Sequence, residues 1–232
     1  MSDARWQLAA EDLQALAWLH AQERDAQALQ ALAVSGFPAS LSLLPADHPA
    51  VRALQEALLP LEALAISDAA QRQHCDDDLA ADYAAIYLTN ALRASPYESV
   101  WRDDDQLMMQ EPTFAVRAFY RRHGMAVPDW RCMPDDHIAH QLSFIAHLLT
   151  QDQPREAARF MQQHLLVWLP DFAEAVNRRA RTRVYAALAS LTLAGCEALR
   201  ERLPAVTVMP PLVAPARQTG DAASAGAGCG AG

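Results

Sequence analysis

Two carboxylic acids and a histidine stand side by side at Asp135-Asp136-His137, directly after Pro134. A histidine changes charge at about pH 6.5, so beside carboxylates it could transfer protons or help to bind a cation. The same residues could also begin a helix, because proline suits the first helical position and carboxylates are favoured in the first turn. The local pattern predicts a helix that starts at Pro134, with Asp135 and Asp136 in its first turn.

A metal site is one chemistry that these residues suggest. His137, His140 and His147, with Cys132 and Asp136, are possible ligands, and histidines three apart can share one side of a helix. The chain has no His-Glu-x-x-His motif, no cysteine pair and no clear fourth ligand, so we do not expect a metal. We expect His140 and His147 to face solvent.

Hydrolytic catalysis lacks its usual signatures. Asp136, His137 and Ser143 do not form a triad, because adjacent residues on a helix diverge by about 100°. The chain has no Gly-x-Ser-x-Gly elbow and no glycine-rich phosphate loop, and it contains no lysine at all. We therefore do not expect an enzyme.

Apolar side chains recur at helical spacing around this motif and through most of the chain. Ile138, Leu142, Ile145 and Leu149 follow spacings of four, three and four, which predicts a helix after His137. Pro170 is expected to start a new helix. The other expected helices cover residues 5–22, 25–34, 50–66 (broken or kinked at Pro60), 79–88 (with Asp76-Asp77-Asp78 at its first turn), 113–123, 155–169, 171–179 and 182–203.

The composition of the 232-residue chain favours helices. Hydrophobic residues make up 52% of it, and several of its only eight glycines lie near the C-terminus. We expect an all-α, single-domain helical bundle of about ten helices over residues 1–208. A flexible, disordered tail rich in Ala, Gly and Pro is expected over residues 209–232, because it has too little apolar surface to fold alone.

Charge and cysteine usage limit the partners and the compartment. A formal net charge of −9 opposes non-specific nucleic-acid binding, which needs a basic surface, and suits a basic peptide. The four cysteines include no close pair, which fits a reducing compartment, and Cys229 is expected to be an incidental thiol. Without a signal-peptide pattern or roughly 18 successive apolar residues, the sequence predicts a cytoplasmic protein without stable membrane insertion.

A second polar and aromatic patch lies upstream, at Ser95-Pro96-Tyr97-Glu98-Ser99-Val100-Trp101, and Glu111-Pro112 follows it. Pro96 and Pro134 are 38 positions apart. Together the two patches resemble the TorD/DmsD family of redox-enzyme maturation chaperones, which carry a Pro-Tyr-Glu-Ser-like turn and, later, a Glu-Pro-Asp-Asp-His-like motif. The resemblance covers roughly residues 83–149. Met133 stands where the family usually has an acid.

The resemblance implies a non-catalytic, system-specific chaperone in the cytoplasm. Its partners would be the apo form of a molybdenum-cofactor oxidoreductase and the twin-arginine signal peptide of that client, and it would aid cofactor insertion and proofreading before export. No cofactor is implied, although some family members are reported to bind guanine nucleotide weakly. Some members also exchange parts between two chains, so a domain-swapped homodimer with a hinge near residues 125–133 is a further implication.

The resemblance also implies a site where the two patches meet. Its carboxylates would bind arginines of the signal peptide and its rings would contact the apolar segment. His137 would either bond to the upstream turn or contact the client. The alternatives are that Tyr97 and Trp101 only fill the edge of the core, and that the protein is a general helical scaffold for a folded partner. The candidate peptide- and client-binding residues are Tyr97, Glu98, Ser99, Trp101, Asp135, Asp136 and His137.

Overall fold

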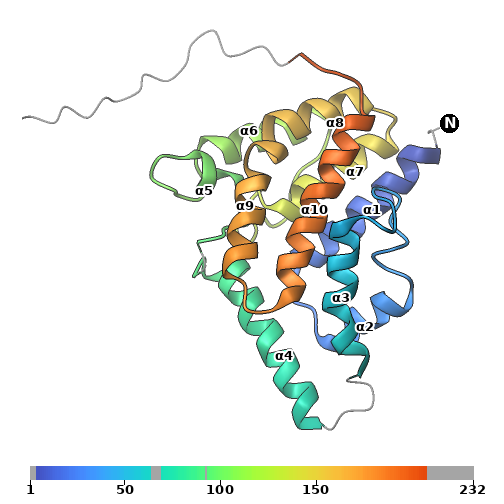
Figure 1. Ribbon diagram of the computed structural model, residues 1–232. Coiled ribbons are helices and arrows are strands. Elements are labelled where there is room, and N and C mark those ends of the chain that lie inside the picture. Colours follow the sequence, from blue (N-terminus) through green and yellow to red (C-terminus); the bar gives the residue numbers. More distant parts are fainter. Residues whose placement is uncertain (1–3, 64–68, 92, 208–232) are drawn as a thin grey trace, which may run out of the picture.

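The computed structural model describes residues 4–63, 69–91 and 93–207 (Figure 1). Over these ranges the chain forms helices and no strand, which confirms the predicted all-α class. The predicted tail at 209–232, with Cys229, lies outside the described residues. The elements are α1 (Ala4–Ala21), α2 (Ala26–Val34), α3 (Pro49–Ala63), α4 (Ala69–Tyr83), the π-helical turn η2 (Ala84–Leu88), α5 (Glu98–Arg102), α6 (Glu111–Arg122), α7 (Ile138–Thr150), α8 (Pro154–Phe160), the π-helical turn η3 (Met161–Leu165), α9 (Leu166–Arg179) and α10 (Arg183–Arg202).

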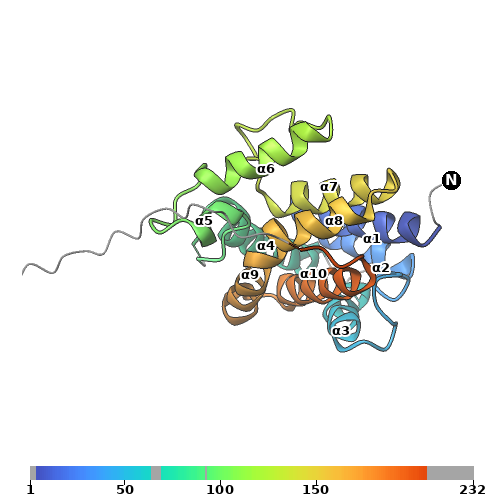
Figure 2. The same ribbon diagram turned by 90° about the horizontal axis from the view of Figure 1, so that it is seen from above.

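The helix that follows the histidine motif is the centre of the bundle. On α7, Ile138, Leu142, Ile145 and Leu149 are all fully buried, as their spacing predicts. This apolar face packs against α1, and α10 packs between α9 and α3. Viewed from above, α6 lies on the outer side of α7 and α8, with α9 and α10 on the opposite side of the bundle (Figure 2).

Two prolines lie inside helices. Pro60 is within α3 and does not break it. The expectation that Pro170 starts a new helix is wrong, because α9 begins at Leu166 and continues through Pro170 to Arg179. An interior proline costs about 3 kcal/mol of helix stability. Trp168 and Phe172, on either side of it, are fully buried, and burial of two such side chains contributes about 3–6 kcal/mol, which is enough to offset that cost.

An aromatic cluster attaches the outer helix α6 to the bundle. Phe119 is 1% exposed, and its ring meets those of Phe144 on α7 and Phe160 on α8 edge to face, at 5.8 and 5.1 Å between centroids. Tyr120 packs against the same two rings, at 4.5 and 5.9 Å. These contacts fix the position of α6, and therefore of the loops that flank it.

Candidate functional site

The two separated patches are joined through their backbones. Tyr97 and His137 form an isolated antiparallel β-bridge. The amide of Ile138 donates to the carbonyl of Pro96 at 2.9 Å, and the amide of Glu98 donates to that of Asp136 at 3.2 Å. The expectation that the patches come together is thus confirmed. We call residues 95–101 with residues 134–138 the clasp.

The bridge changes where the central helix begins. Extended backbone at His137 pairs with Tyr97, so α7 starts only at Ile138, with His137 as its N-cap. The prediction that Pro134, Asp135 and Asp136 form the first helical turn is therefore wrong. The side chain of His137 accepts a hydrogen bond at Nδ1 from the amide of Ala139, at 3.1 Å, which satisfies a free helix-end donor.

His137 is also held by aromatic rings. It is 1% exposed, and its ring meets the ring of Tyr97 edge to face at 5.0 Å between centroids. Burial lowers the pKa of His137 well below its usual value, and the neighbouring imidazole of His140 lowers it further. His137 is therefore a neutral imidazole at physiological pH, which agrees with its acceptor role at Nδ1.

Asp136 turns its carboxylate towards α5 rather than towards solvent. It is fully buried, and its Oδ2 accepts a hydrogen bond from the amide of Ser99 at 2.8 Å. Burial raises the pKa of Asp136, while the hydrogen bond from the Ser99 amide lowers it; burial prevails. Asp136 thus caps the first turn of α5, where free amides favour a carboxylate.

Asp135 ties the clasp to α6. Its Oδ2 accepts from Nε and Nη2 of Arg117, at 3.0 and 2.7 Å, and its carbonyl accepts from the hydroxyl of Tyr120 at 3.0 Å. The Asp135 side chain is 3% exposed and the Arg117 side chain 17%. The pair is therefore largely removed from water, where loss of one partner is costly.

Glu98 gathers three donors around its buried carboxylate. Its Oε1 accepts from Nη1 of Arg102 at 2.5 Å and from Nδ1 of His164 at 3.1 Å. Its Oε2 accepts from Nε2 of Gln141 at 2.7 Å. The Glu98 side chain is fully buried. A charged group can be buried when hydrogen-bond donors replace the water that it loses, and these three donors do so. Glu98 joins α5 to α7 and η3.

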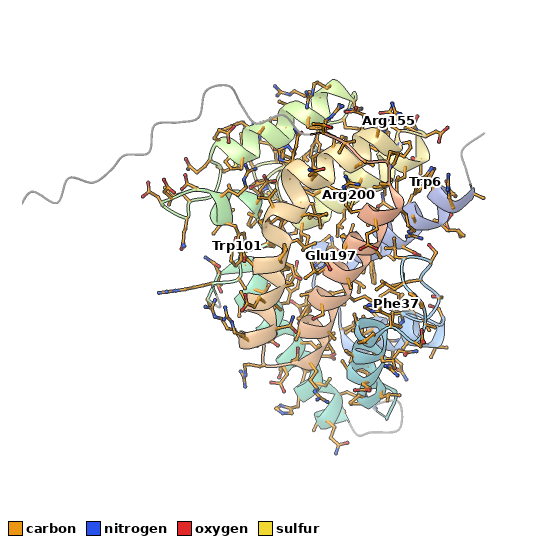
Figure 3. All side chains as sticks on the ribbon, turned by 45° about the horizontal axis from the view of Figure 1, so that its top comes forward. Trp6, Phe37, Trp101, Arg155, Glu197 and Arg200 are labelled. Carbon is orange, nitrogen blue, oxygen red and sulfur yellow. The ribbon has the colours of Figure 1, made fainter. Side chains whose placement is uncertain are left out.

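Trp101 differs from the other candidate residues in exposure. It is half-buried, and its indole N–H donates to the carbonyl of Ser95 at 2.8 Å. It lies on the α5 side of the molecule, across the bundle from Trp6 and Phe37 (Figure 3). The other six candidates, Tyr97, Glu98, Ser99, Asp135, Asp136 and His137, are each at most 8% exposed. In this conformation their polar groups face the interior, and their contact with a client stays a prediction.

Sequence reasoning missed four residues that complete the clasp: Arg117, Tyr120, Gln141 and His164. A signal for two of them was present, since Arg117 and Tyr120 are three apart on a predicted helix and so share a face. Gln141 likewise follows His137 by four positions. Nothing local marked His164, which lies 66 residues from Glu98.

Comparison with known proteins decides the family. The family model described as nitrate reductase delta subunit matches residues 43–174, more than half of the chain. A relative named chaperone protein TorD from Vibrio vulnificus is 30% identical over 179 residues, which cover 72% of this chain and 80% of that protein. The chain belongs to the TorD/DmsD family.

Other relatives of the TorD/DmsD family match a shorter stretch. A chaperone protein TorD from Vibrio cholerae serotype O1 is 36% identical over 135 residues, and the chain spans 61% of the length of that relative. One from Photobacterium profundum is 30% identical over 152 residues, which cover 70% of it. These relatives are named chaperones, a role that needs no chemical reaction.

Among the described residues, no group of three or more His, Cys, Asp or Glu side chains could hold a metal ion. The expectation that His140 faces solvent is wrong. It is partly buried, its Nε2 lies 3.2 Å from the carbonyl oxygen of Met133, and burial lowers its pKa.

Within the described residues, every helix is too short or too polar to cross a bilayer.

A cleft of about 510 Å³ opens beside the clasp, between α1, α7 and the loop after α6. Its walls include Tyr120 and His140, which contact the segment before α7, and four residues of the predicted hinge region. That loop segment is Met125, Ala126, Val127 and Pro128. Glu11 is the single acidic side chain of the cleft, and it already accepts a hydrogen bond from Gln7 at 2.9 Å.

Proposed function

We propose that this chain is a cytoplasmic, system-specific chaperone of a molybdenum-cofactor oxidoreductase. It binds the twin-arginine signal peptide of the apo-enzyme, keeps the client open until the cofactor is inserted, and delays export until then. The observation that carries this proposal is the match to a relative named chaperone protein TorD over 72% of the chain. The acidic net charge of −9 supports a partner that begins with basic residues.

The clasp supports this function because it connects the helices that a client can reach. Glu98 and Asp136 join α5 to α7, and Asp135 joins α6 to the start of α7. The clasp thereby sets the positions of α5 and α6, whose outer surfaces a client can reach. The proposed client contacts at Tyr97, Glu98, Ser99, Asp135, Asp136 and His137 require α5 or α6 to move, whereas Trp101 is accessible without movement.

Trp101 therefore offers the cleanest test of client contact within the clasp. Alanine at Asp136 and His137 together removes two helix caps, so weaker binding by that variant would report lost stability as well as lost contact. In Trp101→Phe a smaller aromatic ring is retained and the bond to Ser95 is lost, while Trp101→Ala removes the aromatic ring altogether. If Trp101 contacts the client, Trp101→Ala binds more weakly than Trp101→Phe at equal helix content by circular dichroism.

Capture of the client from native cytoplasm tests the function as a whole. The tagged chain, purified from the cytoplasm of its own cell, is expected to bring with it the catalytic subunit of one oxidoreductase that lacks its cofactor and retains its signal peptide. Mass spectrometry identifies the protein, and metal analysis of the complex checks for molybdenum. Capture of only the mature, cofactor-loaded enzyme would contradict the proposal.

The second candidate is a general helical scaffold that binds a folded partner. It is favoured by the burial of six of the seven proposed contact residues, which leaves few of their polar groups on the surface. Addition of the synthetic signal peptide to the purified chain separates the two, because a scaffold binds the folded partner and not the isolated peptide. Light scattering on the same sample tests whether the proposed homodimer forms; the swap at a hinge near residues 125–133 stays a prediction.

A further inference from the structure

A surface outside the clasp combines exposed apolar side chains with carboxylates. Leu107 and Met108, in the loop between α5 and α6, are 52% and 43% exposed, and Phe114 in the first turns of α6 is 51% exposed. The same stretch carries Asp104, Asp105 and Glu111, which are also exposed. We call these six residues the α5–α6 edge.

Hydrogen bonds hold the backbone of the loop that carries Leu107 and Met108. The Asp103 carboxylate accepts a hydrogen bond from the amide of Leu107 at 3.1 Å, and the Gln110 side chain donates to the carbonyl of Met108 at 3.0 Å. Gln106 and Met109 adopt positive φ values of 55° and 63°, a conformation that side chains rarely take. These bonds and turns define the backbone conformation of the loop at Leu107 and Met108.

The edge has an excess of negative charge. Two cations lie close to it in the chain, but Arg102 is paired with Glu98, and Arg117 is paired with Asp135. Arg117 also lies against the rings of Phe114 and Trp130, at 5.5 and 4.5 Å from their centroids. Among the ion pairs of the described residues, none involves the carboxylates of Asp104, Asp105 or Glu111.

The acidic and apolar side chains of the edge are close enough for one short peptide segment to contact both. Asp105 is two residues from Leu107, so their Cα atoms are at most about 7 Å apart. A segment in which arginines come directly before apolar residues could place both on the edge at once. The cleft beside α1 and α7 matches such a segment less well, because its single acid, Glu11, is already bonded to Gln7.

We infer that the α5–α6 edge is the docking surface for the arginine-to-apolar junction of a client signal peptide. Arginines of the peptide pair with Asp104, Asp105 and Glu111, and the apolar residues that follow cover Leu107, Met108 and Phe114. This inference rests on the proposed function, and it assigns the first contact to residues outside the clasp.

Two variants of the full chain test the edge, with fluorescence anisotropy of a labelled peptide that has two arginines followed by about twelve apolar residues. Asp104→Asn/Asp105→Asn/Glu111→Gln is expected to weaken binding about fivefold at low salt and less at high salt, because exposed charges are screened. Leu107→Gln/Met108→Gln is expected to weaken it about tenfold at every salt concentration, because apolar burial is lost.

Matched controls change the same side-chain types elsewhere. Asp47→Asn/Asp152→Asn/Glu201→Gln removes three exposed acids elsewhere in the chain, and Leu59→Gln/Leu88→Gln replaces apolar residues that are 56% and 69% exposed. Both controls are expected to bind within twofold of the unaltered chain. Circular dichroism and light scattering of all variants check the fold and the oligomeric state.

The outcomes separate this inference from the proposed function. If the unaltered chain binds the peptide and the edge variants bind as tightly as the controls, the inference is wrong and the function stands. If the unaltered chain does not bind the peptide, both are overturned. If the edge variants instead dissociate a dimer, the edge is a contact between copies of this chain, which also overturns the inference.

Discussion

Replacement of Glu98 by glutamine tests whether the clasp is held by its buried charge. Glu98 accepts from Arg102, His164 and Gln141. In Glu98→Gln the amide oxygen can still accept from Arg102 and His164, but it carries no charge, so the ion pair with Arg102 is lost and the bond from His164 becomes weaker. Each such change costs about 1 kcal/mol, so the free energy of unfolding should fall by about 2 kcal/mol. The new amide group also faces the Gln141 donor, which must turn away.

Glu98→Ala should cost more, about 4 kcal/mol, because the buried donors of Gln141 and His164 and the partly exposed guanidinium of Arg102 lose their acceptor, and a void is left. Urea unfolding followed by circular dichroism at pH 7 measures both values. Glu201→Gln, at an exposed position on α10, is the matched control and should change stability by less than about 0.5 kcal/mol. If Glu98→Gln is as stable as the control, the buried network does not hold α5 to the bundle, and the description of the clasp is wrong.

Three further changes test other contacts. Tyr120→Phe removes the hydroxyl that donates to the Asp135 carbonyl, and should lower the free energy of unfolding by about 1 kcal/mol; no loss would mean that this bond is not made in solution. Phe119→Ala removes a buried ring that attaches α6, and urea unfolding should show a loss of about 4 kcal/mol. Burial lowers the pKa of His20 from 6.5 to about 3, so between these values the unfolded chain binds a proton that the folded chain does not. The free energy of unfolding therefore decreases as the pH is lowered below 6.5, and His20 accounts for a loss of about 2 kcal/mol at pH 5. Urea unfolding between pH 7.5 and 5 measures this dependence. In His20→Gln the slope of the free energy of unfolding against pH should correspond to about one proton fewer than in the unaltered chain.

Local patterns predicted the helices better than their ends. The spacing of Ile138, Leu142, Ile145 and Leu149 was enough to identify the buried face of α7. It could not identify the first residue of that helix, because the start depends on pairing with Tyr97, 40 positions earlier in the chain. The local pattern predicted that the helix starts with Pro134 and the two acids, whereas the pairing with Tyr97 makes His137 the N-cap.

Long-range caps were equally beyond a local reading. Asp76-Asp77-Asp78 was expected at the first turn of a helix over residues 79–88, and this expectation is wrong, since α4 begins at Ala69 and contains all three acids. Asp76 instead accepts a hydrogen bond from the amide of Ala26, at 2.8 Å, at the first turn of α2. Carboxylates suit any free helix start, and the sequence does not say which one they meet in the fold.

The candidate site was predictable in its location and not in its exposure. Nothing in the types of Glu98 and Asp136 indicates whether they face water or the interior, because a carboxylate is stable in either place if donors are present. The donors to these two carboxylates come from α5, α7 and η3, which only the fold brings together. The resemblance to a family marked the residues, while packing determines which of them a partner can reach.

Calorimetric titration with a synthetic twin-arginine signal peptide tests the central claim most directly. We predict saturable binding of one peptide per chain, and a clear loss of affinity when both arginines of the peptide are replaced by glutamine, because the carboxylates of the chain lose their partners. Absence of saturable heat with the twin-arginine peptide, or equal affinity for the glutamine peptide, would contradict the account.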